Sequence, residues 1–155
     1  MEFRKKIRIF IIVIIVICIF ILYIINGFYF RSKQEQIMNQ LGVAICNKDI
    51  DLLDSLVSPD CTVRTIDGKF RNYSYQRSII ESSWNTESYS VTGYHYHLLD
   101  PEEFFWNRTF VQNTAHMIIT DSNGKEYVLA LVVNIDRTSL SDAKITHWSG
   151  LLNEQ

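Results

Sequence analysis

The run GYHYHLLD, residues 93–100, holds the side chains whose types and spacing come closest to a chemical site. In an extended strand, successive side chains point to opposite faces, so Tyr94 and Tyr96 share one face while His95 and His97 share the other. Two histidines two positions apart could bind a metal ion together with a third histidine from elsewhere in the chain. However, no aspartate or glutamate completes a recognised ligand spacing, and aromatic residues in strands usually serve packing. We therefore predict neither a metal site nor a cofactor.

The three cysteines fall in two different kinds of segment. Cys18 lies within a long apolar run, where a cysteine behaves as a small apolar side chain. Cys46 and Cys61 are the only pair in the rest of the chain. In an oxidising compartment, a disulfide between them would close a loop of about 15 residues and stabilise the fold by up to ~3 kcal/mol. The alternative is two buried free thiols, and the sequence leaves both open.

Two acceptor sequences for N-linked glycans are present, Asn72-Tyr73-Ser74 and Asn107-Arg108-Thr109. Both lie near the ends of predicted elements, where a glycan could project into solvent. Asn72 and Asn107 are therefore candidate glycosylation sites if this part of the chain enters a eukaryotic lumen.

The N-terminal region contains seventeen consecutive apolar residues, Ile9 to Ile25. A helix needs roughly 20 apolar residues to cross a bilayer core, and continuing to Phe30 supplies that length. The run is apolar on all sides, so lipid suits it better than the half-buried surface of a small domain. A cleaved signal peptide usually has a shorter apolar region that ends at small residues, whereas aromatic residues follow Gly27. We therefore predict that this segment is retained as a membrane anchor in the lipid bilayer.

Basic residues are unevenly divided around this run. Four precede it, whereas Arg31 and Lys33 follow it with Glu35 nearby. The flank richer in Lys and Arg stays in the cytoplasm, so we predict a cytoplasmic N-terminus and an extracellular or lumenal C-terminal domain. Secretion after signal cleavage is the alternative. The predicted organisation is a cytoplasmic tail (1–8), a transmembrane signal anchor (9–30), a linker (31–35) and a folded domain (36–153).

Helical spacing of apolar residues marks three elements after the anchor. The first, Gln34 to Cys46, places Ile37, Met38, Leu41, Ala44 and Ile45 on one face. Asp49 is expected to cap a second, shorter helix that ends before Ser58-Pro59-Asp60. A third helix, around Ser74 to Trp84, is expected to begin with Ser74 or Asn72 as its cap and to bury Ile79, Ile80 and Trp84.

Alternating patterns predict a hairpin and four longer strands. The hairpin pairs Thr62–Ile66 with Lys69–Arg71 around Asp67-Gly68, a residue pair typical of tight turns. The long strands are expected at 88–98, 108–120, 125–135 and 142–152.

The strand segment Tyr127 to Val133 is apolar at every position, which indicates a strand covered on both faces. Helices can cover one face, so we predict a homodimer through the other, outer face of the sheet. Residues 33–155 carry a formal charge of −6, against +4 for residues 1–32. This acidic balance argues against binding of nucleic acid, which requires a basic surface.

Two stretches resemble the nuclear transport factor 2-like superfamily, whose cystatin-like domains form an α+β cone. AICNKDIDLLDSLVSPDCTV, Ala44 to Val63, resembles the opening of these domains, and AKITHW, Ala143 to Trp148, resembles their closing strand. A short chain with an anchor before such a cone also resembles uncharacterised secreted or membrane members from nematodes. The resemblance implies an α+β fold in which a curved antiparallel sheet of about six strands wraps round three helices.

The resemblance also implies a pocket inside the cone for a small apolar ligand, which Tyr94, Tyr96, His116 and Trp148 could line. Superfamily members that act as isomerases need a carboxylate base facing this interior. Asp121 and Asp136 instead lie at strand ends beside turn residues, and Glu102 and Glu103 follow Pro101 in a loop. No residue is assigned a catalytic role.

The function predicted from these observations is non-enzymatic binding of a partner or a small apolar ligand by a membrane-anchored domain. An isomerase or dehydratase, and a scaffold subunit of a bacterial secretion channel, are the alternatives.

Overall fold

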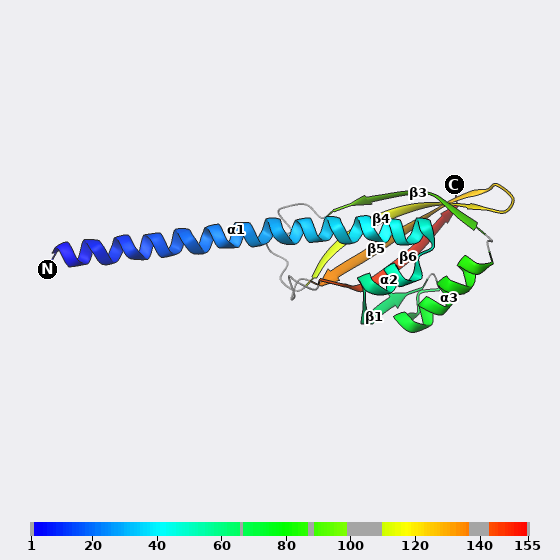
Figure 1. Ribbon diagram of the computed structural model, residues 1–155, viewed down its shortest axis with the longest axis horizontal. Coiled ribbons are helices and arrows are strands. Elements are labelled where there is room, and N and C mark those ends of the chain that lie inside the picture. Colours follow the sequence, from blue (N-terminus) through cyan, green and yellow to red (C-terminus); the bar gives the residue numbers. More distant parts are fainter. Residues whose placement is uncertain (1, 66, 87–88, 99–109, 137–142, 155) are drawn as a thin grey trace. The chain divides into compact units, whose positions relative to one another are not determined.

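The computed structural model describes residues 2–65, 67–86, 89–98, 110–136 and 143–154. The chain divides into two compact units, residues 1–32 and residues 33–155. Within the described residues, two helices are followed by two strands, a third helix and four more strands. Figure 1 shows their arrangement. Asn107, Glu102 and Glu103 lie outside the described residues.

Helix α1 comprises Glu2–Asn47, so it contributes residues to both units. Its most apolar 18-residue window has a mean hydropathy of 3.4, and none of that window is buried. A helix of this kind can serve as a membrane anchor or as a signal sequence. The residues expected to form a linker, 31–35, are helical.

Short polar signals end α1 and start the next helices as expected. Lys48 adopts a left-handed conformation with φ 56°, and the Asp49 backbone N–H donates to Ala44 O at 2.8 Å. Asp49 Oδ1 then accepts from the Leu52 N–H at 2.9 Å, which caps α2, Ile50–Leu56. Asn72, rather than Ser74, caps α3, Tyr73–Asn85, by accepting from the Tyr75 N–H at 3.0 Å.

A single six-stranded sheet has the order β2-β1-β6-β5-β4-β3. Its strands are β1 (Val57–Arg64), β2 (Phe70–Asn72), β3 (Tyr89–His97), β4 (Phe110–Asp121), β5 (Glu126–Asp136) and β6 (Ile145–Glu154). Four of the five pairings are antiparallel, but β1 and β6 pair in parallel, so the expectation of a purely antiparallel sheet was wrong. Strand β6 pairs antiparallel with β5, which fixes the direction of β6. In that direction β6 runs parallel to β1.

Strand β1 begins five residues earlier than predicted, at Val57, immediately after α2. Val57 pairs with Ile145, and the register then shifts before Thr62 pairs with His147. Pro59 lies inside this irregular segment, where a residue without a backbone N–H costs no ladder hydrogen bond. The predicted hairpin turn is present, since Gly68 has φ 78° and its N–H donates to Thr65 O at 2.8 Å.

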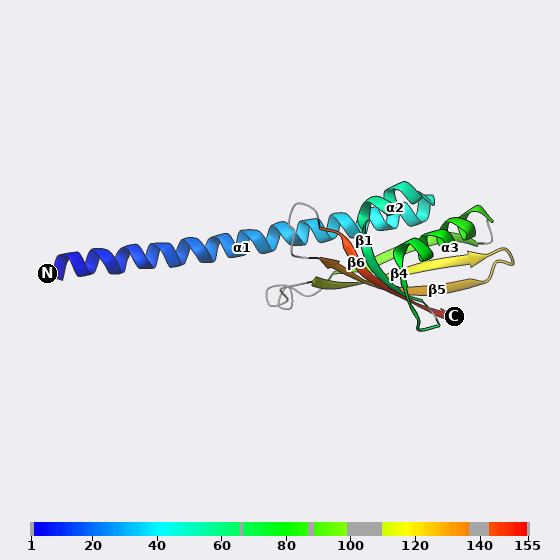
Figure 2. The ribbon, with the colours of Figure 1, turned by 90° about the horizontal axis from the view of Figure 1, so that it is seen from below.

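The helices of the second unit lie on one face of the sheet (Figure 2). The five apolar residues predicted to face inward from 34–46 are all buried, with exposures of 0–8%. Facing them, alternate residues of the sheet close the core: Val63, Val111, Asn113, Ala115, Met117, Val133, Ile135, Ile145 and Trp148. In α3, Trp84 is buried as expected, whereas Ile79 is 43% exposed, so the prediction for Ile79 was wrong.

The opposite, outer face of the sheet carries Gln112, His95, His97 and His116, which are exposed, and Val128, Ala130 and Val132, which are partly exposed. Within the described residues, no helix covers this face (Figure 2).

Candidate functional site

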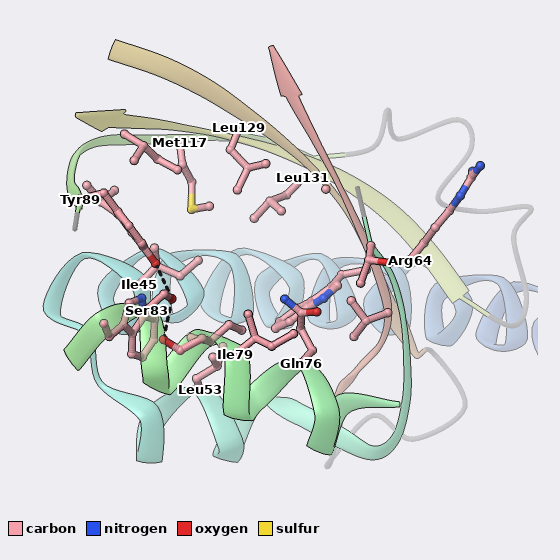
Figure 3. Close-up of a pocket in the computed structure, with 18 of the residues that line it drawn as sticks. Ile45, Leu53, Arg64, Gln76, Ile79, Ser83, Tyr89, Met117, Leu129 and Leu131 are labelled. Atoms are coloured by element: carbon pink, nitrogen blue, oxygen red, sulfur yellow. Dashed lines mark hydrogen bonds between the residues drawn. The ribbon is translucent and has the colours of Figure 1, made fainter. Parts of the chain in front are cut away.

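A cavity of about 430 Å³ lies between α3 and the inner face of the sheet (Figure 3). It exists because the side chains of α3 and those of the central strands do not meet across the sheet's concave face. Alternation along β4 and β5 turns Met117, Leu129 and Leu131 into this space, and Ile45 and Leu53 close it from α1 and α2. The remaining apolar lining comes from Val63, Ile79, Ile80, Trp84, Val91, Ile119, Trp148 and Gly150.

Polar groups in this cavity are few and lie mainly on the α3 side. Gln76 extends from α3 toward the sheet (Figure 3), and its Oε1 is buried with no hydrogen-bond partner in the described part of the chain. Ser83 Oγ donates to Ile80 O at 2.8 Å and lies 3.2 Å from the Tyr89 hydroxyl. Because the serine proton is already used, the Tyr89 hydroxyl is the donor in this second contact.

The β1–β2 hairpin forms the mouth of the cavity with Arg64, Thr65 and Asp67. Thr65 Oγ1 donates to Asp67, and Lys69 Nζ lies 3.1 Å from the Asp67 carboxylate. These contacts, the Thr65 hydrogen bond first, lower the pKa of Asp67 to about 2. Asp67 is the single carboxylate among the lining residues described, and it is a very weak proton acceptor at neutral pH.

Of the four residues expected to line a pocket, Trp148 lines this cavity. Its ring packs edge-on against Tyr73, with ring centroids 5.7 Å apart. Tyr94 and Tyr96 lie on the same inner face but are not among the lining residues. Instead, the Tyr94 hydroxyl donates to Met38 O at 2.9 Å, and its ring lies next to Gly42. Burial raises the pKa of Tyr94, so its hydroxyl stays protonated and acts as a donor.

His116, the fourth residue, lies on the outer face and lines no part of the cavity. Its neighbours Ala115 and Met117 are buried inward, and strand alternation turns His116 the other way. It stands directly opposite His95 in the β3–β4 pairing. The fourth histidine, His147, pairs through Nδ1 with Thr62 Oγ1 at 2.8 Å. Among the described residues, no three metal-ligating side chains of the His, Cys, Asp or Glu types come together.

Cys46 and Cys61 are both free thiols in the structure, so of the two states that the sequence left open the disulfide is not formed. Cys46 is exposed at the end of α1, whereas Cys61 points into the core and is 1% exposed. Burial raises the pKa of the Cys61 thiol to about 12. Of the two candidate glycosylation sites, Asn72 is exposed and serves as the cap of α3, and Asn107 lies outside the described residues.

Sequence reasoning turned Ile79, Ile80 and Trp84 of α3 inward but missed the polar lining residues Gln76 and Ser83. Gln76, Ile80 and Ser83 recur at positions i, i+4 and i+7, which places them on one helix face. That spacing was visible in the sequence. Its significance was not, because a helix face that borders an unfilled space has the same pattern as one that packs tightly.

No family model matches the sequence, and no curated protein matches it either. Solved structures do match the fold. A nuclear transport factor 2-like protein from Cytophaga hutchinsonii has a TM-score of 0.57 at 12% identity, and the match covers 79% of this chain and 98% of that one. One of unknown function from Pseudomonas aeruginosa has a TM-score of 0.57 at 14% identity, with 81% and 98% covered.

A candidate ketosteroid isomerase from Shewanella frigidimarina also has a TM-score of 0.57, at 9% identity, with 74% of this chain and 91% of that one covered. At these identities the likeness shows the fold alone. The folded unit therefore has the cystatin-like α+β cone of nuclear transport factor 2-like proteins, as the resemblance in the sequence implied.

Proposed function

We propose that this chain is a single-pass membrane protein whose cone binds a small apolar ligand without catalysing a reaction on it. The cavity of about 430 Å³ carries the proposal. Its size falls in the range of ligand pockets, roughly 300–1,000 Å³, and its walls are largely aliphatic and aromatic with a few polar groups, as in such pockets.

The position of Asp67 supports binding rather than proton transfer. A base that removes a proton from carbon needs a pKa near the working pH and a place beside the substrate. Asp67 has a pKa of about 2, lies at the mouth, and is 53% exposed while paired with Lys69. A ligand in the cavity would meet side chains that contact it without ready proton exchange.

The anchor is supported by α1, whose apolar part is long enough to cross a bilayer. Arg4, Lys5, Lys6 and Arg8 precede this part of the helix, which favours a cytoplasmic N-terminus. The cone would then lie on the extracellular or lumenal side.

Self-association through the outer face of the sheet completes the proposal. Val128, Ala130 and Val132 leave apolar surface there, and a second copy would bury it. Val132→Asp would place a charge in the centre of that interface. In light scattering of the detergent-solubilised chain, we expect Val132→Asp to convert dimers into monomers. Gln112→Asp, nearer the strand end, should retain dimers. Monomers in the unmodified protein would refute the dimer.

Ligand binding is tested with 1-bromonaphthalene, an apolar compound whose bromine quenches indole fluorescence on contact. The full chain is placed in lipid nanodiscs with Trp106→Phe, so that Trp84 and Trp148, which both line the cavity, are the remaining tryptophans. We expect quenching that saturates with probe concentration. Quenching that rises linearly, as in nanodiscs with a surface tryptophan peptide, would refute the proposal.

A pair of neighbouring substitutions locates the bound probe. Gly150→Leu fills the cavity, since a Cβ at Gly150 meets Leu129 and Leu131 at 3.4 and 3.5 Å, which is ordinary contact. Ser149→Leu adds the same side chain on the outer face of β6. We expect Gly150→Leu to abolish saturable quenching and Ser149→Leu to preserve it, with circular dichroism confirming that both variants fold.

A further inference from the structure

The unpartnered amide oxygen of Gln76 distinguishes one part of the cavity from the rest. Buried polar atoms in folded proteins nearly always have a hydrogen-bond partner, so an exception calls for an explanation. Gln76 is one of the residues that line the cavity, its Oε1 is buried, and no described residue donates to this oxygen. The side chain extends toward Leu129 and Leu131 across the open space (Figure 3).

The two hydroxyl groups beside Gln76 in this wall, those of Ser83 and Tyr89, have already used their protons. Ser83 donates to Ile80 O, and Tyr89 donates to Ser83 Oγ. What the Ser83–Tyr89 pair still presents to a ligand is oxygen lone pairs. Gln76 Oε1 is likewise an acceptor. These three oxygens therefore favour a ligand that brings a donor over one that brings only a carbonyl oxygen or a carboxylate.

We infer that the ligand is a hydrophobic alcohol or phenol whose hydroxyl donates to Gln76 Oε1. This inference rests on the proposed binding function and adds the chemical class of the ligand. The apolar body fits among Leu129, Leu131 and Trp148 on the sheet side, where nothing but carbon contacts are needed. The hydroxyl faces α3, where it supplies the hydrogen bond that the amide oxygen lacks.

The inference is tested with 4-bromophenol and 4-bromoanisole, which differ by replacement of the hydroxyl proton with a methyl group. Both quench tryptophan through bromine, and the same nanodisc protein with Trp106→Phe reports their binding. After correction for partition into empty nanodiscs, we expect 4-bromophenol to bind about fivefold more tightly, the equivalent of ~1 kcal/mol for one hydrogen bond.

Gln76→Met removes the acceptor and keeps the length of the side chain. We expect the two compounds to bind this variant within a factor of about two of one another, since the hydrogen bond is gone. Gln112→Met, the same change on the outer face, should retain the fivefold preference.

The outcomes separate this inference from the proposed function. Equal, saturable binding of both compounds to the unmodified protein overturns the inference and leaves the binding function standing. A preference that survives in Gln76→Met overturns the assignment to Gln76. Absence of saturable binding by either compound overturns the inference, and if 1-bromonaphthalene also fails to bind saturably, the proposed function itself is overturned. The comparison of the two compounds on the unmodified protein decides the matter even if Gln76→Met does not fold.

Discussion

Gln34 Nε2 donates to Asn113 Oδ1 at 3.2 Å, a hydrogen bond between two side chains that are each 1% exposed. It joins α1, at the start of the folded unit, to the inner face of β4. Asn113 Nδ2 also lies 3.5 Å from Val111 O, so the amide is held from two sides. A polar pair inside an otherwise apolar core fixes how the helix lies along the strand.

Replacement of Gln34 by Leu should therefore destabilise the folded unit. The change leaves Asn113 Oδ1 without this partner in a buried position, and we expect a loss of roughly 1–3 kcal/mol in the free energy of unfolding. Chemical denaturation of the detergent-solubilised chain, followed by circular dichroism, measures it. Gln36→Leu, at an exposed position two residues away, is the control and should change stability by less than ~0.5 kcal/mol. Equal effects would show that the buried pair contributes nothing.

Gly42 is required where Tyr94 crosses α1. A Cβ at this position would lie 2.5 Å from Tyr94 Cδ1, which is closer than any real contact allows. Because the Tyr94 hydroxyl is held by Met38 O, the ring cannot move away without losing that hydrogen bond. We expect Gly42→Ala to destabilise the fold by about 1–3 kcal/mol through overpacking. Thermal unfolding measures the change, and in a Tyr94→Val background, where the ring is absent, Gly42→Ala should cost much less than in the unmodified chain.

Asp54 joins α2 to α3 through two partners. Arg77 Nε donates to both of its carboxylate oxygens, at 2.8 and 3.1 Å, and the Tyr73 hydroxyl donates at 2.7 Å. Arg77 also contacts Glu81, an exposed partner one helical turn away. The Asp54 side chain is 35% exposed. We therefore expect Asp54→Ala to cost about 1 kcal/mol in unfolding free energy and Glu81→Ala no more than ~0.5 kcal/mol. The reverse order in urea titrations would contradict this.

The two thiols should differ in reactivity because their environments differ. Burial raises the pKa of Cys61 to about 12, so at pH 8 it is almost wholly protonated, and the thiolate is the reactive form. At pH values between the ordinary pKa of a thiol and 12, Cys61 is deprotonated in the unfolded chain and protonated in the folded chain. Cys61 therefore favours folding up to about pH 9, and its contribution falls as the pH rises toward 12.

With Cys18→Ala, a thiol reagent at pH 8 should modify Cys46 quickly and Cys61 only after denaturation. Mass spectrometry of the modified peptides provides the readout, and Cys46→Ser should remove the fast phase. If neither thiol reacts in denaturant until a reductant is added, the two cysteines are bridged.

The side of the membrane occupied by the cone can be read from proteolysis and glycosylation together. In sealed microsomes, we expect added protease to spare residues 33–155. After the vesicles are dissolved in detergent, we expect glycosidase to shift the mobility of the chain. Asn72→Asp removes one acceptor while keeping a side-chain oxygen to cap α3, and Ser74→Ala removes it without touching the cap. Both should lose the same glycan with little loss of stability. Digestion of the cone from the outside of the vesicles would reverse the predicted orientation.

The sequence by itself determined the elements that depend on neighbours along the chain. Asp49 caps α2, the 65–69 turn closes on Gly68, and apolar residues spaced along 34–46 are buried, because each requires only local geometry and the helical period. The strands at β3 to β6 also lie close to their predicted bounds, since their alternation is local. The N-terminal apolar run likewise revealed itself by length and composition.

Only the tertiary structure decided how these elements meet. The parallel pairing of β1 with β6, the outward position of His116 and the absence of a Cys46–Cys61 bridge follow from the register and direction of strands far apart in the chain. The cavity also depends on elements far apart in the chain. Ile79 and Gln76 border open space because the curved sheet does not reach α3 there. A periodic sequence pattern specifies which face of an element turns inward, but whether that face finds a packing partner or a void depends on all of the elements together.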